Sequence, residues 1–159
     1  MKNLAIIITL LTPVLSFANE IKILHSDLIC FDKVNKRYKY VASLTLKNIS
    51  NKDLILITKT SGVGIGREYN GKPAEIFIAP GESTINGVKI IPTSEKIGLV
   101  TLRPSESTQV TKKFSSKHYI QTAILQYGAT AVYNNYFKNW TGSVNSKKTN
   151  TSIQEPCKP

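Results

Sequence analysis

The segment RYKYVASLTLKN, residues 37–48, constrains the fold of this chain more than any other stretch of its sequence. Ala42, Leu44 and Leu46 alternate there with polar residues, so that apolar and polar side chains point to opposite sides. A period of two is typical of a β-strand with one buried face. Turn-forming residues follow at 48–53, after which DLILITKT, residues 53–60, resumes as a strand. This part of the chain therefore predicts β-structure.

Short apolar runs separated by turn signals continue along the chain. They occupy residues 21–32, 74–79, 83–92, 96–104, 108–114 and 138–146. Residues 118–137 are long enough for a helix, but their β-branched and aromatic residues and Gly128 favour two strands or one bent strand. About seven to eight short strands with hardly any amphipathic helix predict a single all-β domain, an antiparallel sandwich or barrel.

Three segments make the chain similar to a known class of domain. The hairpin YVASLTLKNISNKDLILI, the corner LRPSES and the late segment YNNYFKNWTGS resemble bacterial exported immunoglobulin-like β-sandwich domains. The resemblance implies an antiparallel immunoglobulin-like sandwich over residues 19–146. The marks of antibody domains are absent, because Trp140 lies late in the chain and the two cysteines are too far apart. The resemblance therefore implies a fold and no function.

The first 18 residues have the order of a secretory signal peptide. Lys2 precedes an apolar run at residues 4–15 that is too short to span a bilayer core of about 30 Å, and two small residues two positions apart follow, Ser16 and Ala18. We expect cleavage after Ala18, export to the periplasm or the extracellular space, and no transmembrane segment in the mature chain. A buried first strand or helix is the alternative. The predicted division is signal peptide 1–18, β-sandwich 19–146 and polar tail 147–159.

The only two cysteines, Cys30 and Cys157, both follow the predicted cleavage point. An even number of cysteines in an exported protein indicates a disulfide. This bond would join the first predicted strand to the tail and stabilise the fold by about 4–5 kcal/mol through loop closure. Two free thiols are the alternative. A redox role is not expected, because the sequence has no C-x-x-C pair.

Basic residues outnumber acidic residues by 21 to 10, and the net charge is +11. Such an excess favours an anionic partner, whether head groups, wall polymers, nucleic acid or an acidic protein. Only three of the 21 cations are arginines, the residue suited to bidentate phosphate recognition. We therefore expect a protein or an anionic envelope component as the partner, and we disfavour nucleic acid.

The segment DKVNKRYKY, residues 32–40, is one candidate binding surface because its cations are interleaved with tyrosines. Basic and aromatic side chains together bind polyanions through charge and stacking. The predicted surface consists of Lys33, Lys36, Arg37, Tyr38, Lys39 and Tyr40. A solvated hairpin turn with one tyrosine edge buried is the alternative.

The glycine-rich stretch SGVGIGREYNGKP, residues 61–73, is the second candidate surface. Its alternating glycines lack the spacing of a dinucleotide fingerprint, and Gly71-Lys72 lacks the Ser or Thr that follows in a P-loop. We predict a linker between strands that carries Arg67 and Tyr69 outward, since Arg and Tyr are favoured at interfaces. No cofactor is expected.

Catalytic and metal-binding patterns are weak in this sequence. The two histidines, His25 and His118, are far apart, the ten acidic residues form no telling pair, and there is no G-x-S-x-G elbow. We therefore expect no metal site and no enzymatic activity. Three N-x-S/T sequences begin at Asn48, Asn139 and Asn150 and would accept glycans in a eukaryotic secretory route.

These features predict an exported, non-enzymatic binding module that recognises a protein or an anionic envelope component. One alternative is an exported inhibitor or immunity-type protein that blocks an enzyme or a toxin. Another is a structural subunit or accessory factor of a surface or secretion assembly, which would use an exposed strand edge. The sequence assigns no oligomeric state.

Overall fold

The computed structural model describes residues 20–59, 64–65, 73–78, 83–85, 88–90, 98–129 and 137–157. The predicted signal peptide lies outside the described residues, as do Arg67 and Tyr69 of the glycine-rich stretch. Gly64 and Ile65 of that stretch form a short strand. No helix among the described residues is both long and apolar enough to cross a membrane.

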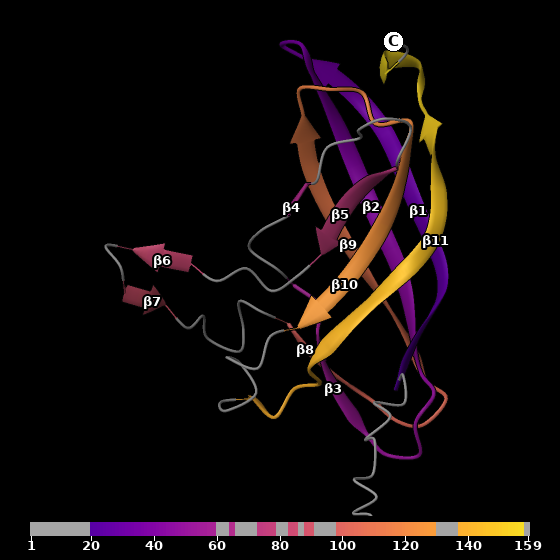
Figure 1. Cartoon of the computed structure of the whole chain (residues 1–159), viewed down its shortest axis with the longest axis vertical. Helices are drawn as coiled ribbons and strands as arrows, with labels where there is room; N and C mark the ends of the chain where they lie inside the picture. Colours follow the sequence, from indigo (N-terminus) through magenta and orange to yellow (C-terminus); the bar gives the residue numbers. More distant parts are fainter. Residues whose placement is uncertain are drawn as a thin grey trace, which may run out of the picture.

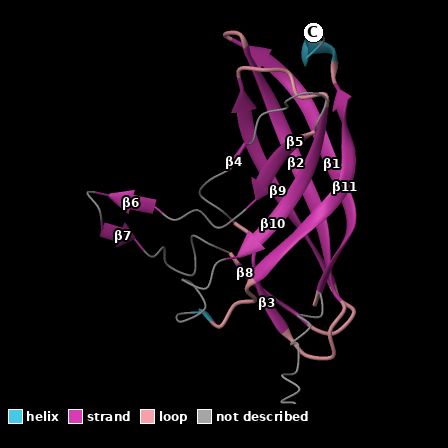
Figure 2. Ribbon diagram, viewed as in Figure 1, coloured by secondary structure: helices cyan, strands magenta, loops and turns pink. Residues whose placement is uncertain are grey.

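Strands make up nearly all the regular structure of the described residues (Figures 1 and 2). They are β1 (Ile21–Val34), β2 (Arg37–Asn48), β3 (Leu54–Ile57), β4 (Gly64–Ile65), β5 (Ala74–Ile78), β6 (Ser83–Ile85), β7 (Val88–Ile90), β8 (Leu99–Leu102), β9 (Ser107–Ser116), β10 (Thr122–Ala129) and β11 (Gly142–Ile153), followed by the 3₁₀ turn η1 (Glu155–Cys157). The all-β prediction is therefore confirmed, with more strands than the seven or eight expected.

Seven strands form one curled sheet in the order β4-β5-β10-β11-β1-β2-β9. Strands β3 and β8 form a separate pair, as do β6 and β7. The expected antiparallel sandwich is only partly confirmed, because β1 runs parallel to β11 and β5 runs parallel to β10. The physical reason is that alternation determines which face of a strand is buried but not which neighbour it takes or in which direction.

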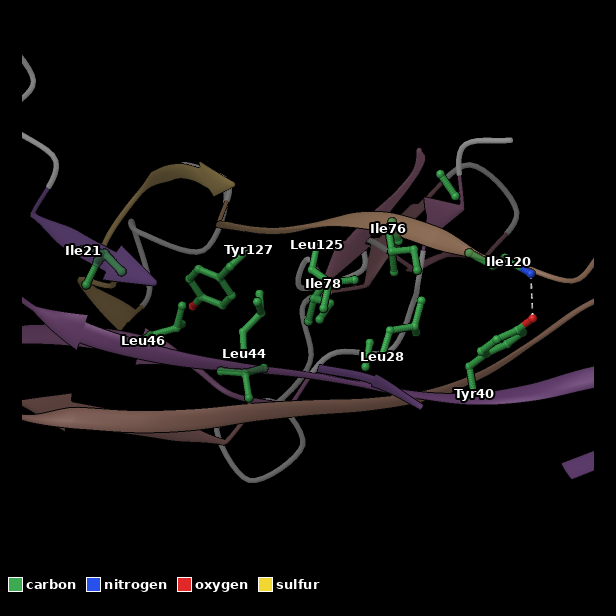
Figure 3. Close-up of a cluster of buried hydrophobic side chains, with 14 of the residues drawn as sticks. Ile21, Leu28, Tyr40, Leu44, Leu46, Ile76, Ile78, Ile120, Leu125 and Tyr127 are labelled. Carbon is green, nitrogen blue, oxygen red and sulfur yellow. Dashed lines mark hydrogen bonds between the residues drawn. The ribbon is translucent and has the colours of Figure 1, made fainter. Parts of the chain in front are cut away.

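The inner face of the curled sheet carries the core (Figure 3). Strand β2 contributes Ala42, Leu44 and Leu46, the residues predicted from alternation, and all three are fully buried. Leu125 and Ile76 reach the same core from β10 and β5. Residues far apart in sequence thus share one core, as expected of a single domain.

Two buried tyrosines connect strands of the main sheet to neighbouring segments by hydrogen bonds. The Tyr40 hydroxyl accepts a hydrogen bond from the Ile120 backbone N–H at 2.8 Å, which links β2 to the segment before β10 (Figure 3). The Tyr127 hydroxyl accepts from Ile57 N–H at 3.2 Å and donates to Ile57 C=O at 2.9 Å, which joins β10 to β3. Burial raises the pKa of Tyr127 well above its ordinary value. Each phenol therefore satisfies buried backbone groups that would otherwise lack partners.

Residues 147–153, expected in a loose polar tail, lie instead in strand β11. Their inward side chains are polar but have partners: Thr149 Oγ1 is 2.7 Å from Ser26 Oγ, and Thr151 Oγ1 donates to the Ile120 carbonyl at 2.6 Å. The expected boundary between domain and tail at residue 146 was therefore wrong. Polar residues can form part of a strand when their side chains find hydrogen-bond partners. The Cys30–Cys157 disulfide is confirmed, with a Cα–Cα distance of 5.8 Å.

Candidate functional site

The turn between β1 and β2 begins the candidate site. Asn35 and Lys36 form a two-residue loop between the paired residues Val34 and Arg37, with φ angles of 50° and 60°. Positive φ at both loop positions is the geometry of a type I′ turn, whose twist matches that of the flanking strands. Asparagine tolerates this conformation, whereas a lysine in the second position, where glycine is preferred, is strained. The tip of the hairpin therefore holds a cation at an energetic cost.

Strand β9 brings a second segment to this hairpin end. Tyr38 pairs with Ser116 in the β2–β9 register, so the following residue, Lys117, lies level with Arg37. The turn, the end of β9 and η1 all lie at the upper end of the sheet in Figure 1. We call this region the basic end, and it consists of Lys33, Lys36, Arg37, Lys39 and Lys117.

Two aromatic rings lie at the basic end, and one of them contacts Lys33. The Tyr38 and Tyr119 rings meet edge to face with centroids 5.5 Å apart, and Lys33 Nζ lies 4.7 Å from the Tyr38 centroid. A cation within about 6 Å of a ring face is attracted by its quadrupole. The predicted mixture of cations and aromatic rings is thus present, with Tyr119 added from outside the predicted segment.

Tyr40 is not part of this surface, although the sequence placed it there. Its side chain is 0% exposed, stacks on Phe114 with centroids 5.2 Å apart and binds Ile120. Tyr40 shares its parity with Ala42 and Leu44, so the alternation that identified the core also assigns it to the interior.

Most of the charge at the basic end is not neutralised by nearby acids. Of its five cations, Lys39 alone pairs with an acid within the described part of the chain, through Asp32 at 3.1 Å. Arg37 Nη1 makes only a long contact of 3.4 Å to Ser115 Oγ. Neither residues 33–40 nor residues 113–119 contain an acid. The acids at this end of the sheet are Asp32 and Glu155 of η1, and the five cations outnumber them. The basic end therefore concentrates positive potential that an anion can neutralise.

The edge of the sheet beside the basic end is also basic. Strand β9 carries Lys112 and Lys113, which face opposite sides of the sheet because they are consecutive. Lys112 pairs with the buried Ala42, so its stem lies on the inner side, and burial lowers the pKa of its ammonium group. Lys113 pairs with Val41 and is exposed on the outer side.

The histidines are not brought into a metal site. His25 Nε2 lies 2.9 Å from Asp27 Oδ2 on an exposed stretch of β1, and His118 follows β9 at the other end. No group of three or more His, Cys, Asp or Glu side chains within the described ranges is arranged to hold a metal ion.

In two of the three glycan acceptor sequences the asparagine is buried in the folded chain. Asn48 is 0% exposed, and its Nδ2 donates to the carbonyls of Lys52 and Leu102 at 2.8 and 2.9 Å. Asn139 is 3% exposed beside Trp140. Both side chains are buried, so a glycan at either position is incompatible with this fold, whereas Asn150 is exposed on β11.

Sequence reasoning found the hairpin half of the site and missed the half from β9. Lys117 and Tyr119 join the hairpin only through the β2–β9 pairing, and nothing in the local sequence announces that pairing. Comparison of this chain with protein-family models, curated proteins and solved structures gives no match.

Proposed function

We propose that this chain is an exported, non-enzymatic binding protein whose basic end holds an anionic partner. The observation that carries the proposal is the gathering of Lys33, Lys36 and Arg37 with Lys117 from β9 at one end of the sheet, where they outnumber the acids Asp32 and Glu155 among the described residues. The predicted signal peptide and the disulfide, which persists in oxidising compartments, support export.

The position of Lys36 supports a role in binding. A lysine in the left-handed region is disfavoured by roughly 1–2 kcal/mol relative to glycine, and this strain is common where a side chain has a functional task. Lys36 is exposed at the tip of the hairpin, where a large anionic surface can reach its charge. Tyr38 and Tyr119 supply rings against which sugar or lipid groups pack.

The proposal is tested by salt-dependent retention on heparin and on vesicles that contain an anionic phospholipid. The double variant Lys36→Glu/Lys117→Glu should elute at clearly lower NaCl than the wild type. Contacts between charges weaken as salt screens them. Each contact removed should make the dependence of log affinity on log salt concentration less steep by about one.

The double variant Lys22→Glu/Lys47→Glu is the matched control. It makes the same change in net charge away from the basic end, because Lys22 of β1 pairs with Lys47 of β2 at the opposite end of the β1–β2 hairpin. Ten residues separate Lys47 from Arg37, about 33 Å along a strand. Equal loss of retention in both double variants would show that net charge alone is responsible, and the basic end would then have no special role.

A further inference from the structure

The free edge of β9 suggests what kind of anion this protein binds. Strand β9 ends the order of the main sheet, and among the described residues only β2 pairs with it. A strand edge exposes unpaired N–H and C=O groups that can form hydrogen bonds with another extended chain. At ten residues, Ser107–Ser116 is the longer of the two edge strands of the main sheet.

The register determines which backbone groups face outward. The two-residue turn makes Val34 and Arg37 a hydrogen-bonded pair, so odd-numbered residues of β2 bond to β1 and even-numbered residues bond to β9. The hydrogen bond from Asn48 N–H to the Glu106 carbonyl, 3.0 Å, agrees with this alternation. The groups that point to the free edge therefore belong to Gln109, Thr111, Lys113 and Ser115.

We propose that the free edge of β9 binds an extended acidic segment of a partner protein by β-strand addition. The inference rests on the proposed function, because it identifies the anionic partner as a peptide segment. Backbone pairing would supply affinity, and acidic side chains of the added strand would lie opposite Lys113 on the outer face of the sheet. The basic end adjoins the same strand and would receive acids that follow along the segment.

A second copy of this chain fits the edge poorly. Two copies of β9 could pair antiparallel over nearly their full length in two registers. In one register Lys112 of one copy lies opposite Lys112 of the other, and in the second register the two lysines are diagonal neighbours. Like charges in these positions are destabilising. Strand β9 contains no acid that would compensate. The lysines thus disfavour self-association and favour an acidic strand.

The two faces of β9 differ, and this difference favours an added segment in which apolar and acidic residues alternate. Val110 and Phe114 point toward the core side, whereas Lys113 points outward. A segment that alternates apolar and acidic residues would place its apolar side chains beside Val110, Phe114 and the stem of Lys112 on one face and its acidic side chains beside Lys113 on the other. The probe is therefore a ten-residue peptide of alternating valine and glutamate, with a valine–lysine peptide as its control.

The test measures backbone amide hydrogen exchange and affinity on the full chain. The valine–glutamate peptide should slow exchange at Gln109, Thr111, Lys113 and Ser115, and the valine–lysine peptide should not bind. Gln109→Pro removes one outward donor, whereas Gln109→Ala keeps it. Affinity for the peptide should be about tenfold weaker in Gln109→Pro than in Gln109→Ala, as expected for one hydrogen bond.

A second measurement leaves the protein unchanged. Methylation of alternate peptide nitrogens removes donors from one side of the peptide, and methylation on the side that faces β9 should abolish binding. Should Gln109→Pro not fold, this comparison still decides the question. Equal affinity of the methylated and plain peptides, or protection confined to residues 33–37, would overturn strand addition.

Heparin retention distinguishes the two proposals. If the peptide fails to protect β9 while the basic-end variants still lose retention on heparin or vesicles, only strand addition is wrong and the partner is a polymer or a lipid surface. If neither binding of the peptide nor retention on the anionic matrices changes in the β9 and basic-end variants, the proposed function is wrong as well.

Discussion

Replacement of Lys36 by glycine separates the stability of the β1–β2 turn from the charge at its tip. Lys36 has a φ angle of 60° in a type I′ turn. Relief of this conformation is worth roughly 1–2 kcal/mol, and the greater freedom of glycine in the unfolded chain offsets about 0.4–1 kcal/mol of it. Lys36→Gly should therefore raise the free energy of unfolding by about 0.5–1 kcal/mol while it weakens binding to heparin.

Urea unfolding measures the first effect and NaCl elution from heparin measures the second. For an m-value of about 1–3 kcal/mol/M, the midpoint should rise by a few tenths of a molar. Lys36→Ala is the control, because alanine removes the charge but keeps a Cβ in the left-handed conformation. It should lose retention as Lys36→Gly does, without the gain in stability.

The two results refute different parts of the reasoning. A Lys36→Gly variant that is less stable than the wild type would show that the turn does not strain the lysine. A variant that gains stability and keeps full heparin retention would show that Lys36 has no part in binding.

Four further predictions concern the fold. Tyr127→Phe should lower the free energy of unfolding by about 1–3 kcal/mol in urea melts, because it leaves the buried N–H and C=O of Ile57 without partners. Burial holds the pKa of Tyr127 in the folded protein above its ordinary 10.0, so this phenol loses its proton at lower pH in the unfolded chain than in the folded one. The free energy of unfolding of the wild type should therefore fall as the pH rises above 10.0. Tyr127→Phe should lack this part of the decline, which urea melts at several pH values would measure. Replacement of Cys30 and Cys157 by serine opens a link across 127 positions and should cost about 4–5 kcal/mol, and a loss below 1 kcal/mol would contradict the loop-closure argument. Lys22→Glu converts a like-charge cross-strand pair into an opposite one and should stabilise by about 0.2–1 kcal/mol, an effect that high salt should remove.

Local sequence pattern predicted the strands but not their partners. The alternating segment at residues 37–48 has the same bounds as β2, and its apolar residues form the core as expected. The disulfide also followed from the sequence, because two cysteines leave only one intramolecular pairing. Strand direction did not follow, since the parallel pairs β1–β11 and β5–β10 join segments far apart in the chain.

The polar strand β11 illustrates a second limit. Residues 147–153 contain one apolar side chain, Ile153, so hydrophobic pattern alone favours a loop. Their place in the sheet depends on hydrogen bonds such as that between Thr149 and Ser26, which exist only once β1 lies alongside. The same dependence on long-range pairing hid Lys117, which β9 brings to the hairpin.

The most direct test of the central claim is residue-level mapping of the contact with an anion. A heparin oligosaccharide titrated into ¹⁵N-labelled protein should shift backbone amide signals at residues 33–39 and 117–119, and these shifts should diminish as NaCl is added. Shifts centred on Lys22 and Lys47 at the opposite end of the hairpin, or spread evenly over the lysines, would contradict the assignment of binding to the basic end.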